Sequence, residues 1–589
     1  MARMEAAEAL VDVLDREGVR HVFGVPGGPV LGLCDAISRH PRISLVLTKH
    51  EQAAAYAAFG SALATGQMGV CLATLGPGAT NLLAGLPVAR VEAVPVLAIT
   101  GQVQLSGMAR GAHQDASGWY GTPDQKAMFG GTCKQTELCT LASSLPDLAR
   151  RAIRAATSDR QGPVHVSIPS GLLHETIDYS PLDPKQYRLM ENCAVDKGAA
   201  ARVARALSEA KAPAILLGGR AMRPACGPAV RALADAFGIA LCADLASKSV
   251  VDEHHSNYLG CIGVLGHKAA ENFLKKTADL ILSVGQSFDE ISTLGWDPAF
   301  AERRSLIQLD SIGEEIGKAF PVSDASVGHL PALLEAICEA HPTLSQERLV
   351  GRQQRLAEEL RRNPTFSSVE MVSDKVPMLP QRVMADLTAA VPEDAVVLSD
   401  SSKWARWLGR FFRAREGQIF SAHDYEPMGW AVAAALGVQA ARPDTPVICL
   451  SGDGAFLMAA LEVSTAVDHS LPIVWMVMND GRLGIIHDLQ RTLFGGRVCG
   501  TTFNTPNLPA FAQSLGADGA VVESPGALVS ALSAAITAKR PTILDIRFDV
   551  EEIPALRPRS LLVTKGMGLP NPTPGPETIR TLFKLMKER

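Results

Sequence analysis

One segment near the C-terminus constrains the fold more than any other part of the chain. It reads, in order, as an apolar run at Val447–Ser451, a Gly-Asp-Gly turn at 452–454, a stretch with helical spacing, a second apolar run at Ile473–Met478, and the pair Asn479-Asp480. Two apolar runs joined through a helix are typical of a βαβ unit in a buried parallel sheet. The segment therefore predicts an α/β domain in which Asp453 and Asn479 lie at the same edge of the sheet.

The two side chains at this edge, 26 positions apart, both offer oxygen atoms. The carboxyl ends of successive parallel strands line a common crevice, so Asp453 and Asn479 can reach one ion. Oxygen ligands suit Mg²⁺ or Ca²⁺, and Mg²⁺ usually bridges to phosphate oxygens. Gly452 and Gly454 let backbone N–H groups approach a phosphate at the start of the helix. Asp-Gly turns are common elsewhere, but this setting predicts a magnesium and diphosphate site.

The rest of the chain shows the same alternation of short apolar runs and helical stretches. Its 589 residues are too many for a single hydrophobic core, and a typical size of roughly 100–200 residues per domain predicts about three domains. We predict an α/β protein with three doubly wound parallel-sheet domains at 1–180, 190–345 and 378–555, followed by a C-terminal tail at 556–589. The charged, strand-poor stretch 344–378 predicts a helix and a linker, and no sequence repeat relates the last domain to the first.

Composition excludes several classes of function. Lys and Arg (56) nearly balance Asp and Glu (61), and no dense basic window indicates nucleic-acid binding. Eleven Cys residues form no CxxC pair, which favours a reducing compartment. The first 20 residues lack the apolar core of a signal peptide, and the longest apolar run, Pro427–Ala441, is shorter than the ~20 residues of a membrane span. We expect a cytoplasmic protein with no membrane or nucleic-acid partner.

A single acid in the first domain is the second candidate for chemistry. The apolar run Ile43–Thr48 leads into Lys49-His50-Glu51 and then an Ala-rich stretch, Gln52–Ala64, which places Glu51 at the start of a helix. An acid in the first turn interacts favourably with the helix dipole by roughly 0.3–1 kcal/mol, and that structural role suffices for most such residues. Only together with the Gly-Asp-Gly segment does Glu51 become a candidate catalytic acid.

With both features present, the chain resembles the thiamine-diphosphate-dependent decarboxylases and carboligases, nearest to the large subunit of acetohydroxyacid (acetolactate) synthase. The resemblance rests on VFGVPGG (22–28), KHEQAAAYAAFGSALATG (49–66), TLGPGATN (74–81), EPMGWAVAAALG (426–437) and the segment 452–480. It implies that the first domain binds the pyrimidine ring of the cofactor and the last binds its diphosphate. In this family those domains come from two subunits, so the resemblance implies a homodimer or homotetramer.

The resemblance also implies a role for individual residues. The cofactor, thiamine diphosphate with Mg²⁺, should contact Gly28, Glu51, Pro77, Ser402, Lys403, Glu426, Met428, Gly452, Asp453, Gly454 and Asn479, with the metal on Asp453, Asn479 and the Gly481 carbonyl. Glu51 should hydrogen-bond the aminopyrimidine, Met428 should hold the cofactor bent, and the Glu426 carbonyl should accept its 4′-amino group. Gln114 should face the reacting carbons. Ser402 and Lys403 stand in a Ser-Ser-Lys segment where the family more often has glycine.

Three positions depart from the synthases. Phe288-Asp289-Glu290-Ile291 replaces their Phe-Asp-Asp-Arg, whose Arg binds the carboxylate of the second 2-oxoacid, and an aliphatic side chain has no donors for that task. Leu489 replaces a Trp that helps to select the acceptor. His487 stands where the synthases are apolar; it is a candidate acid that orients an acceptor or protonates an alkoxide, although a lone His is more often structural. These replacements predict an acceptor pocket that differs from that of the synthases.

Several reactions stay open at this point. The leading hypothesis is a carboligase that decarboxylates a 2-oxoacid such as pyruvate and transfers the acyl carbanion to an acceptor carbonyl. A decarboxylase or acyl-CoA lyase without ligation is a close alternative. The segment Leu259–His267 matches an FAD-binding region of some relatives in length but not in residues, so FAD binding and a pyruvate-oxidase-like reaction stay open. A silent regulatory paralogue is disfavoured, because Glu51, Asp453 and Asn479 are all present.

Overall fold

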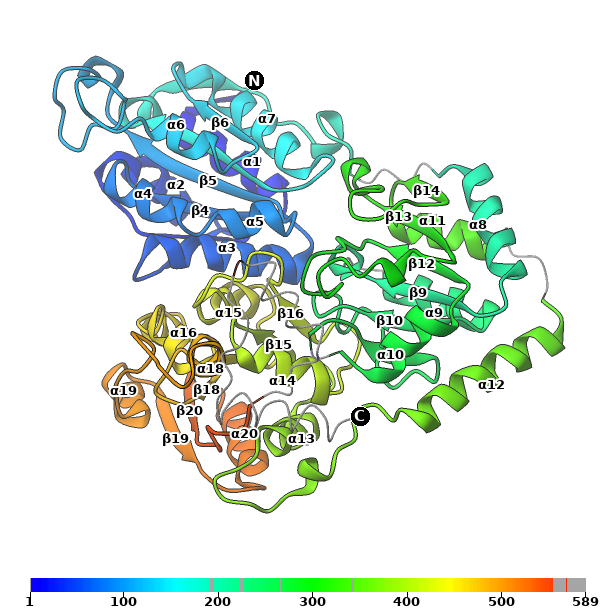
Figure 1. Cartoon of the computed structure of the whole chain (residues 1–589). Coiled ribbons are helices and arrows are strands. Elements are labelled where there is room, and N and C mark those ends of the chain that lie inside the picture. Colours follow the sequence, from blue (N-terminus) through cyan, green and yellow to red (C-terminus); the bar gives the residue numbers. More distant parts are fainter. Residues whose placement is uncertain are drawn as a thin grey trace.

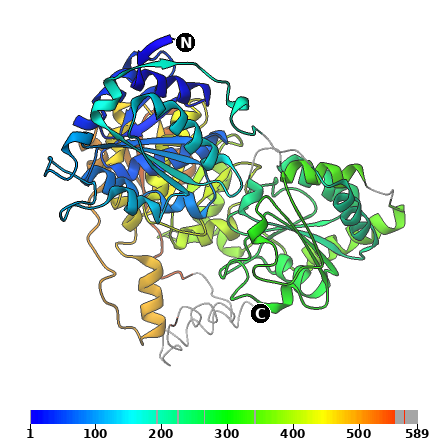
Figure 2. The same cartoon turned by 90° about the horizontal axis from the view of Figure 1, so that it is seen from above.

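The computed structural model describes residues 2–190, 195–222, 226–264, 266–340, 344–553 and 568, so nearly all of the expected tail lies outside the described residues. The described residues form three parallel six-stranded sheets, each flanked by helices (Figure 1). The predicted α/β class with three doubly wound parallel sheets is therefore confirmed. Seen from above, the first and third sheets overlap, and the central one lies to the side (Figure 2).

The first sheet has the strand order β3-β2-β4-β5-β7-β6. Its strands are β2 (His21–Gly24), β3 (Ser44–Leu47), β4 (Gly69–Ala73), β5 (Val96–Gln102), β6 (Gln135–Leu138) and β7 (Pro163–Pro169). Its helices are α1 (Ala6–Arg16), α2 (Leu31–Arg39), α3 (Glu51–Thr65), α4 (Pro77–Leu83), α5 (Pro87–Val91), α6 (Gln125–Gly130) and α7 (Leu145–Thr157). An antiparallel pair, β1 (Ala2–Glu5) with β8 (Thr176–Tyr179), joins the two ends of this region.

The third sheet has the order β16-β15-β17-β18-β20-β19. Its strands are β15 (Val396–Ser399), β16 (Ile419–Ser421), β17 (Val447–Gly452), β18 (Ile473–Met478), β19 (Asp518–Val522) and β20 (Thr542–Ile546). Its helices are α13 (Pro380–Ala390), α14 (Lys403–Phe411), α15 (Trp430–Ala441), α16 (Asp453–Leu457), α17 (Glu462–Asp468), α18 (Gly484–Leu493), α19 (Leu508–Ser514) and α20 (Ala527–Ala538). Counted from its own first strand, this order is the same as that of the first sheet, although no sequence repeat relates the two.

The central sheet has a different order, β11-β10-β9-β12-β13-β14, which is the order of dinucleotide-binding folds. Its strands are β9 (Pro213–Leu217), β10 (Ala240–Ala243), β11 (Tyr258–Cys261), β12 (Leu280–Val284), β13 (Ser305–Asp310) and β14 (Asp324–Val327). The main helices are α8 (Lys197–Glu209), α9 (Cys226–Phe237), α10 (Lys268–Asn272) and α11 (Leu330–Glu339). The helix predicted within 344–378 is α12 (Gln346–Arg362), which leads to the third domain.

Two apolar helices join the first and third sheets. α3 and α15 each follow the second strand of their sheet, and they pack along each other (Figure 1). A Cβ atom on Gly60 would meet the carbonyl oxygen of Ala434, and one on Gly437 would meet that of Ala57. The two glycines therefore allow the helix backbones to touch. This packing explains the apolar run around α15, and no described helix is long and apolar enough to cross a bilayer.

Candidate functional site

The carboxyl ends of β15, β17 and β18 border a cavity of ≈ 310 Å³ between the central and third sheets. Its wall brings together six of the residues predicted to bind a cofactor: Ser402, Lys403, Glu426, Met428, Gly452 and Gly454. The central domain contributes Val264 and Ile291. Ligands bind at this edge of open α/β sheets because loops leave it on both faces. The cavity is therefore the candidate site for the diphosphate end of a cofactor.

Asp453 lies beneath the wall of this cavity as the first residue of α16. Its Oδ1 accepts the N–H of Gly454 at 2.9 Å, and its Oδ2 accepts the N–H of Gly481 at 2.8 Å and the hydroxyl of Thr505 at 2.5 Å. Burial raises the pKa of Asp453 to about 6, and the nearby Asp480 carboxylate contributes to the rise. Two adjacent carboxylates that resist ionising together are stabilised by a shared proton or a cation.

The neighbouring pair Asn479-Asp480 is placed differently from the sequence expectation. The Asn479 amide donates to Asp545 Oδ1 at 2.9 Å, whereas Asp480 lines the cavity. Side chains alternate along an extended segment, so Asp480 faces the same way as Met478, which also lines the cavity. The structure therefore presents Asp480, rather than Asn479, beside Asp453. The alternation was available in the sequence and could have identified Asp480.

The Gly481 carbonyl, which is expected to complete the metal shell, already accepts a hydrogen bond. The carbonyl of Gly481 accepts the N–H of Phe503 at 3.0 Å, while Leu483 N–H donates to Thr501. Arg482 lies between these two backbone bonds in an isolated bridge with Thr502, so its own carbonyl points away from that loop. Of these two carbonyls, the one that this loop does not engage is therefore that of Arg482. Within the described ranges no three His, Cys, Asp or Glu side chains form a metal cluster.

The Ser-Ser-Lys segment forms the start of α14 at this end of the cavity. Ser402 is the N-cap, and its hydroxyl accepts the N–H of Trp404 at 3.1 Å. Lys403 Nζ lies 2.8 Å from Asp480 Oδ2 and 3.8 Å from Asp488 Oδ2. The helix start and the ammonium group add positive potential beside two carboxylates. Together they suit a diphosphate bound through a divalent cation.

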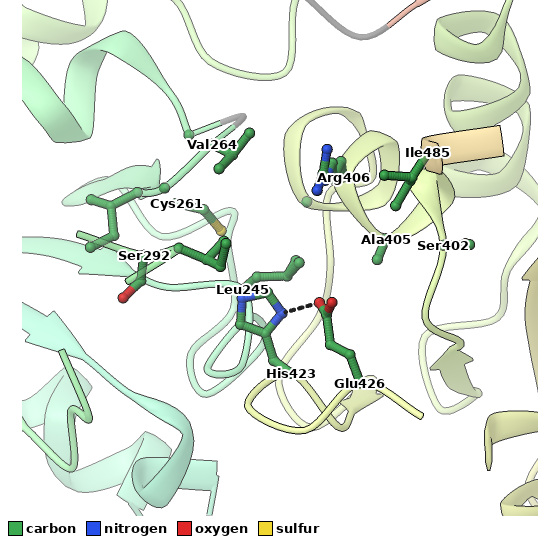
Figure 3. Close-up of a pocket in the computed structure, with 15 residues that line it drawn as sticks. Leu245, Cys261, Val264, Ser292, Ser402, Ala405, Arg406, His423, Glu426 and Ile485 are labelled. Atoms are coloured by element: carbon green, nitrogen blue, oxygen red, sulfur yellow. Dashed lines mark ion pairs between the residues drawn. The ribbon is translucent and has the colours of Figure 1, made fainter. Parts of the chain in front are cut away.

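The loop between β16 and α15 forms another wall. Glu426 adopts a left-handed φ of 46°, which is strained for a residue with a side chain. Its carboxylate pairs with His423 Nδ1 at 3.1 Å (Figure 3). Burial opposes the charge on His423, but the hydrogen bond and the negative charge of Glu426 raise the pKa of His423 to about 10. Sequence reasoning missed His423, because only the folded loop brings it to Glu426.

The first domain holds the remaining predicted site residues in a second group. Glu51 begins α3, and its Oε2 accepts Asn81 Nδ2 at 3.0 Å. A Cβ atom on Gly78 would lie 2.9 Å from Glu51 Oε1, and one on Gly76 would lie 3.0 Å from the Gln114 carbonyl oxygen. Glu51, Pro77 and Gln114 therefore lie around the start of α4, and Pro77, Gln114 and Gly28 are exposed. The residues that line the ≈ 310 Å³ cavity all come from the other two domains.

Leu489 and His487, two of the positions that depart from the synthases, both lie on α18 but differ in what they face. Leu489 lines the cavity, but His487 does not. His487 is buried, and its Nδ1 lies 3.1 Å from the Thr501 hydroxyl. Burial and the charges of Arg482 and Arg491 lower the pKa of His487, so it is neutral at neutral pH. The structure thus places His487 away from the cavity wall that Leu489 lines, because two positions along a helix differ by ~200°, and the role of His487 stays a prediction.

Residues that follow β9 and β12 lie close together at the crevice where a dinucleotide would bind. A Cβ atom on Gly218 would meet the backbone of Gln286, whose Nε2 donates to the Leu217 carbonyl at 3.1 Å. Arg220 forms three hydrogen bonds to buried Asp310, the last residue of β13, at 2.9, 3.2 and 2.7 Å. FAD binding in the central domain stays a prediction. The segment Leu259–His267 reaches the third domain, where His267 Nε2 lies 3.0 Å from the Arg410 carbonyl.

Comparison with known proteins gives a consistent result along the chain. Residues 4–128, 200–337 and 400–546 match the N-terminal TPP binding domain, the central domain and the C-terminal TPP binding domain of thiamine pyrophosphate enzymes. The acetolactate synthase of Arthrospira platensis is 33% identical over 566 residues, which cover 93% of this chain and 95% of the relative. A probable acetolactate synthase large subunit of Methanococcus aeolicus is 30% identical over 93% of this chain and 92% of its own. A putative thiamine pyrophosphate-containing protein, YdaP, of Bacillus subtilis (strain 168) is 31% identical over 93% of this chain and 92% of its own.

Proposed function

Since the chain belongs to the thiamine pyrophosphate (thiamine diphosphate) enzymes, we propose that it is a carboligase that decarboxylates a 2-oxoacid such as pyruvate and joins the acyl unit to an acceptor carbonyl. One observation carries the proposal. Asp453, Asp480 and Lys403 gather at the end of a cavity that also contains Met428 and Glu426. This set suits a diphosphate, a divalent cation and an apolar ring in one place.

The residues of the cavity fit the cofactor in three respects. Carboxylates of Asp453 and Asp480 and the carbonyl of Arg482 are oxygen ligands of the kind that Mg²⁺ prefers. Gly452 and Gly454 line the cavity without side chains, and a Cβ atom on Gly452 would lie 3.7 Å from the Cβ atom of the Ser402 N-cap, so the glycines leave room there for phosphate oxygens. Met428 offers an apolar surface on which the central thiazolium ring would rest. We assign the metal to Asp453, Asp480 and Arg482 in place of Asn479 and Gly481.

When bound, thiamine diphosphate supplies a nucleophilic carbon that attacks the carbonyl of a 2-oxoacid. The protein then has to orient the aminopyrimidine and exclude water. Glu51 would hold the proton at the pyrimidine nitrogen, and the amide of Asn81 keeps that carboxylate in place. The carbonyl of Glu426 would accept the amino group, which accounts for the strained backbone at this residue.

The chain carries two separate groups of predicted cofactor-binding residues, one around Glu51 and one around Asp453, which we call half-sites. Their separation supports a homo-oligomer. The cavity beside Asp453 is lined by the central and third domains alone, so the group around Glu51 takes no part in its wall. We propose that each group is completed by the other one from a second subunit. Exposed apolar side chains lie next to both groups: Trp119 and Tyr120 follow Gln114, and Met458 and Leu461 follow α16 with 60% exposure each. Such side chains are suited to a subunit interface. We propose a homodimer or a dimer of dimers, located in the cytoplasm.

The first experiment is carbon dioxide release from pyruvate by the purified chain with Mg²⁺ and thiamine diphosphate, with and without aldehyde and ketone acceptors, followed by product mass. Acceptor-dependent product that is lost in Glu51→Gln supports the carboligase. Carbon dioxide with no ligated product, whatever the acceptor, would instead identify a simple decarboxylase. Bound flavin absorbance together with oxygen uptake would identify the oxidase alternative.

A further inference from the structure

A second, smaller cavity adjoins the first, and Arg406 lines both. Arg406 lies in the first turn of α14, and its guanidinium projects between the central domain and the loop that carries His423 and Glu426 (Figure 3). Val264, Ile291 and Ile485 also face both cavities. Apart from Glu426 and the Ser402 hydroxyl, the shared wall is therefore aliphatic around a single guanidinium.

The other cations near this wall have anionic partners. Lys403 pairs with Asp480 at 2.8 Å, His423 pairs with Glu426 at 3.1 Å, and Arg482 pairs with Glu551 at 3.6 Å. Among the described residues Arg406 has neither a hydrogen bond nor a carboxylate within ion-pair distance, although Glu426 and Asp488 act on it from further away. Burial lowers the pKa of Arg406, yet an arginine side chain stays protonated in proteins.

A partly buried guanidinium without a partner is costly, unless an anion binds to it. Its planar fork of N–H groups matches a carboxylate with two parallel hydrogen bonds. The aliphatic neighbours leave room for a short carbon chain, and the other charged side chain of the shared wall, Glu426, is already paired with His423. The geometry therefore favours a small anion with an apolar body.

We propose that Arg406 binds the carboxylate of a 2-oxoacid substrate and selects anionic over neutral substrates. This inference rests on the proposed function, and it names the substrate class of the same site. The carboxylate belongs either to the donor that is decarboxylated or to an acceptor that keeps its carboxylate. Both sources share the chemistry, and kinetics separate them.

The test uses the holoenzyme and the variants Arg406→Gln and Arg406→Lys. Arg205→Gln is the matched control, because it removes the same charge from an exposed position of α8. Oxamate, an inert carboxylate isostere of pyruvate, is titrated by calorimetry. We expect Arg406→Gln to weaken oxamate binding about 10–100-fold, the range for a charge-assisted hydrogen bond, with a smaller loss in Arg406→Lys. Thiamine diphosphate affinity should stay within about twofold in all three variants.

Kinetics then separate the two sources. If the donor carboxylate binds Arg406, carbon dioxide release from pyruvate without acceptor shows a KM about 10–100-fold higher in Arg406→Gln. If the acceptor carboxylate binds there, only ligation to 2-oxobutyrate is impaired, and ligation to acetaldehyde is not. Unchanged oxamate affinity in Arg406→Gln, or an equal loss of thiamine diphosphate and oxamate binding, overturns the proposal. Arg406-dependent oxamate binding in an enzyme that does not turn over pyruvate would refute the proposed donor and keep the anion site.

Discussion

The first and third domains share one strand order but use the same sheet edge differently. In the third domain the carboxyl ends of the strands face a cavity that the central domain closes from the side. In the first domain the corresponding edge, with Glu51, Pro77 and Gln114, lies outside that cavity and is partly exposed. Topology thus fixes where a ligand can bind, and the side chains after each strand decide which end of the ligand is recognised.

The two equivalent helices show the same contrast. α3 begins with its own acid, and Glu51 receives one hydrogen bond from Asn81. α15 begins after left-handed Gly429, and the acid there is Asp400 at the end of β15, which accepts the N–H groups of Gly429 and Ala431 at 3.0 and 3.1 Å. The acid of the first domain is left available for a ligand, while that of the third is used to hold the helix.

The largest expected effect separates the two candidate metal ligands at the end of β18, Asp480 and Asn479. Asp480→Ala should lower Mg²⁺ affinity in the presence of thiamine diphosphate by at least about tenfold, because it removes a metal ligand. Asn479→Ala should leave Mg²⁺ affinity unchanged and cost about 1–3 kcal/mol of stability, since it leaves Oδ1 of buried Asp545 without its donor, while Oδ2 keeps its bond to Arg547. Metal titration and urea unfolding measure the two effects. A tenfold loss of Mg²⁺ affinity in Asn479→Ala alone would restore Asn479 as the ligand.

The next effect concerns the contact between the two domains. Gly437→Val should destabilise the protein by about 1–3 kcal/mol, because its side chain would meet the Ala57 carbonyl of α3. Gly351→Ala in α12 is the control; its Cβ atom meets nothing within 4 Å, and it should be neutral or slightly stabilising. Urea unfolding checks both. Equal stability of the Gly437 variant and the wild type would mean that the α3–α15 contact does not couple the domains.

The smallest effect is a pH dependence where the first and third domains meet. Burial raises the pKa of Glu92 to about 8, and its Oε1 accepts the N–H of Asp424 at 2.9 Å. Glu92 therefore binds its proton more tightly in the folded chain, and stability should fall as pH rises from about 4.5 towards 8. Glu92→Gln keeps an oxygen acceptor and should be more stable than the wild type by about 1 kcal/mol at pH 8.5, with little difference near pH 4.5.

The measurement is urea unfolding of the wild type and Glu92→Gln across this pH range. Asp424 has a raised pKa as well, so Asp424→Asn serves as the matched variant. A pH profile that is unchanged by Glu92→Gln would show that the Glu92 carboxyl does not drive the loss of stability.

Much of the fold could be predicted from local patterns. The apolar run Ile473–Met478 has the same bounds as β18, the run Val447–Ser451 forms β17 except for its last residue, and the acid predicted to start a helix does so in α3. The shared strand order could not be predicted, because strand pairing depends on contacts between distant segments. The domain boundaries stay predictions.

The site was harder to predict than the fold. Gly452, Asp453 and Gly454 follow one another at the end of a strand. Because the ends of parallel strands meet at one edge of the sheet, the sequence identified all three as site residues. Asn479 and Asp480 differ by one position, and the choice depends on which face each side chain takes. The sequence shows that Ile291 stands where the synthases have a carboxylate-binding Arg. It does not show that Arg406 of α14 lies at the same cavity wall, because only tertiary packing brings the two together.

The central claim is that the half-site of Glu51 and the half-site of Asp453 act together across a subunit interface. Glu51→Gln and Asp453→Ala chains, each inactive alone, are mixed, unfolded and refolded together, and acyl transfer is measured. A mixed dimer would contain one intact site, so about a quarter of wild-type activity should return when subunits pair at random. No recovered activity, in mixtures shown by mass to contain mixed dimers, would contradict the account.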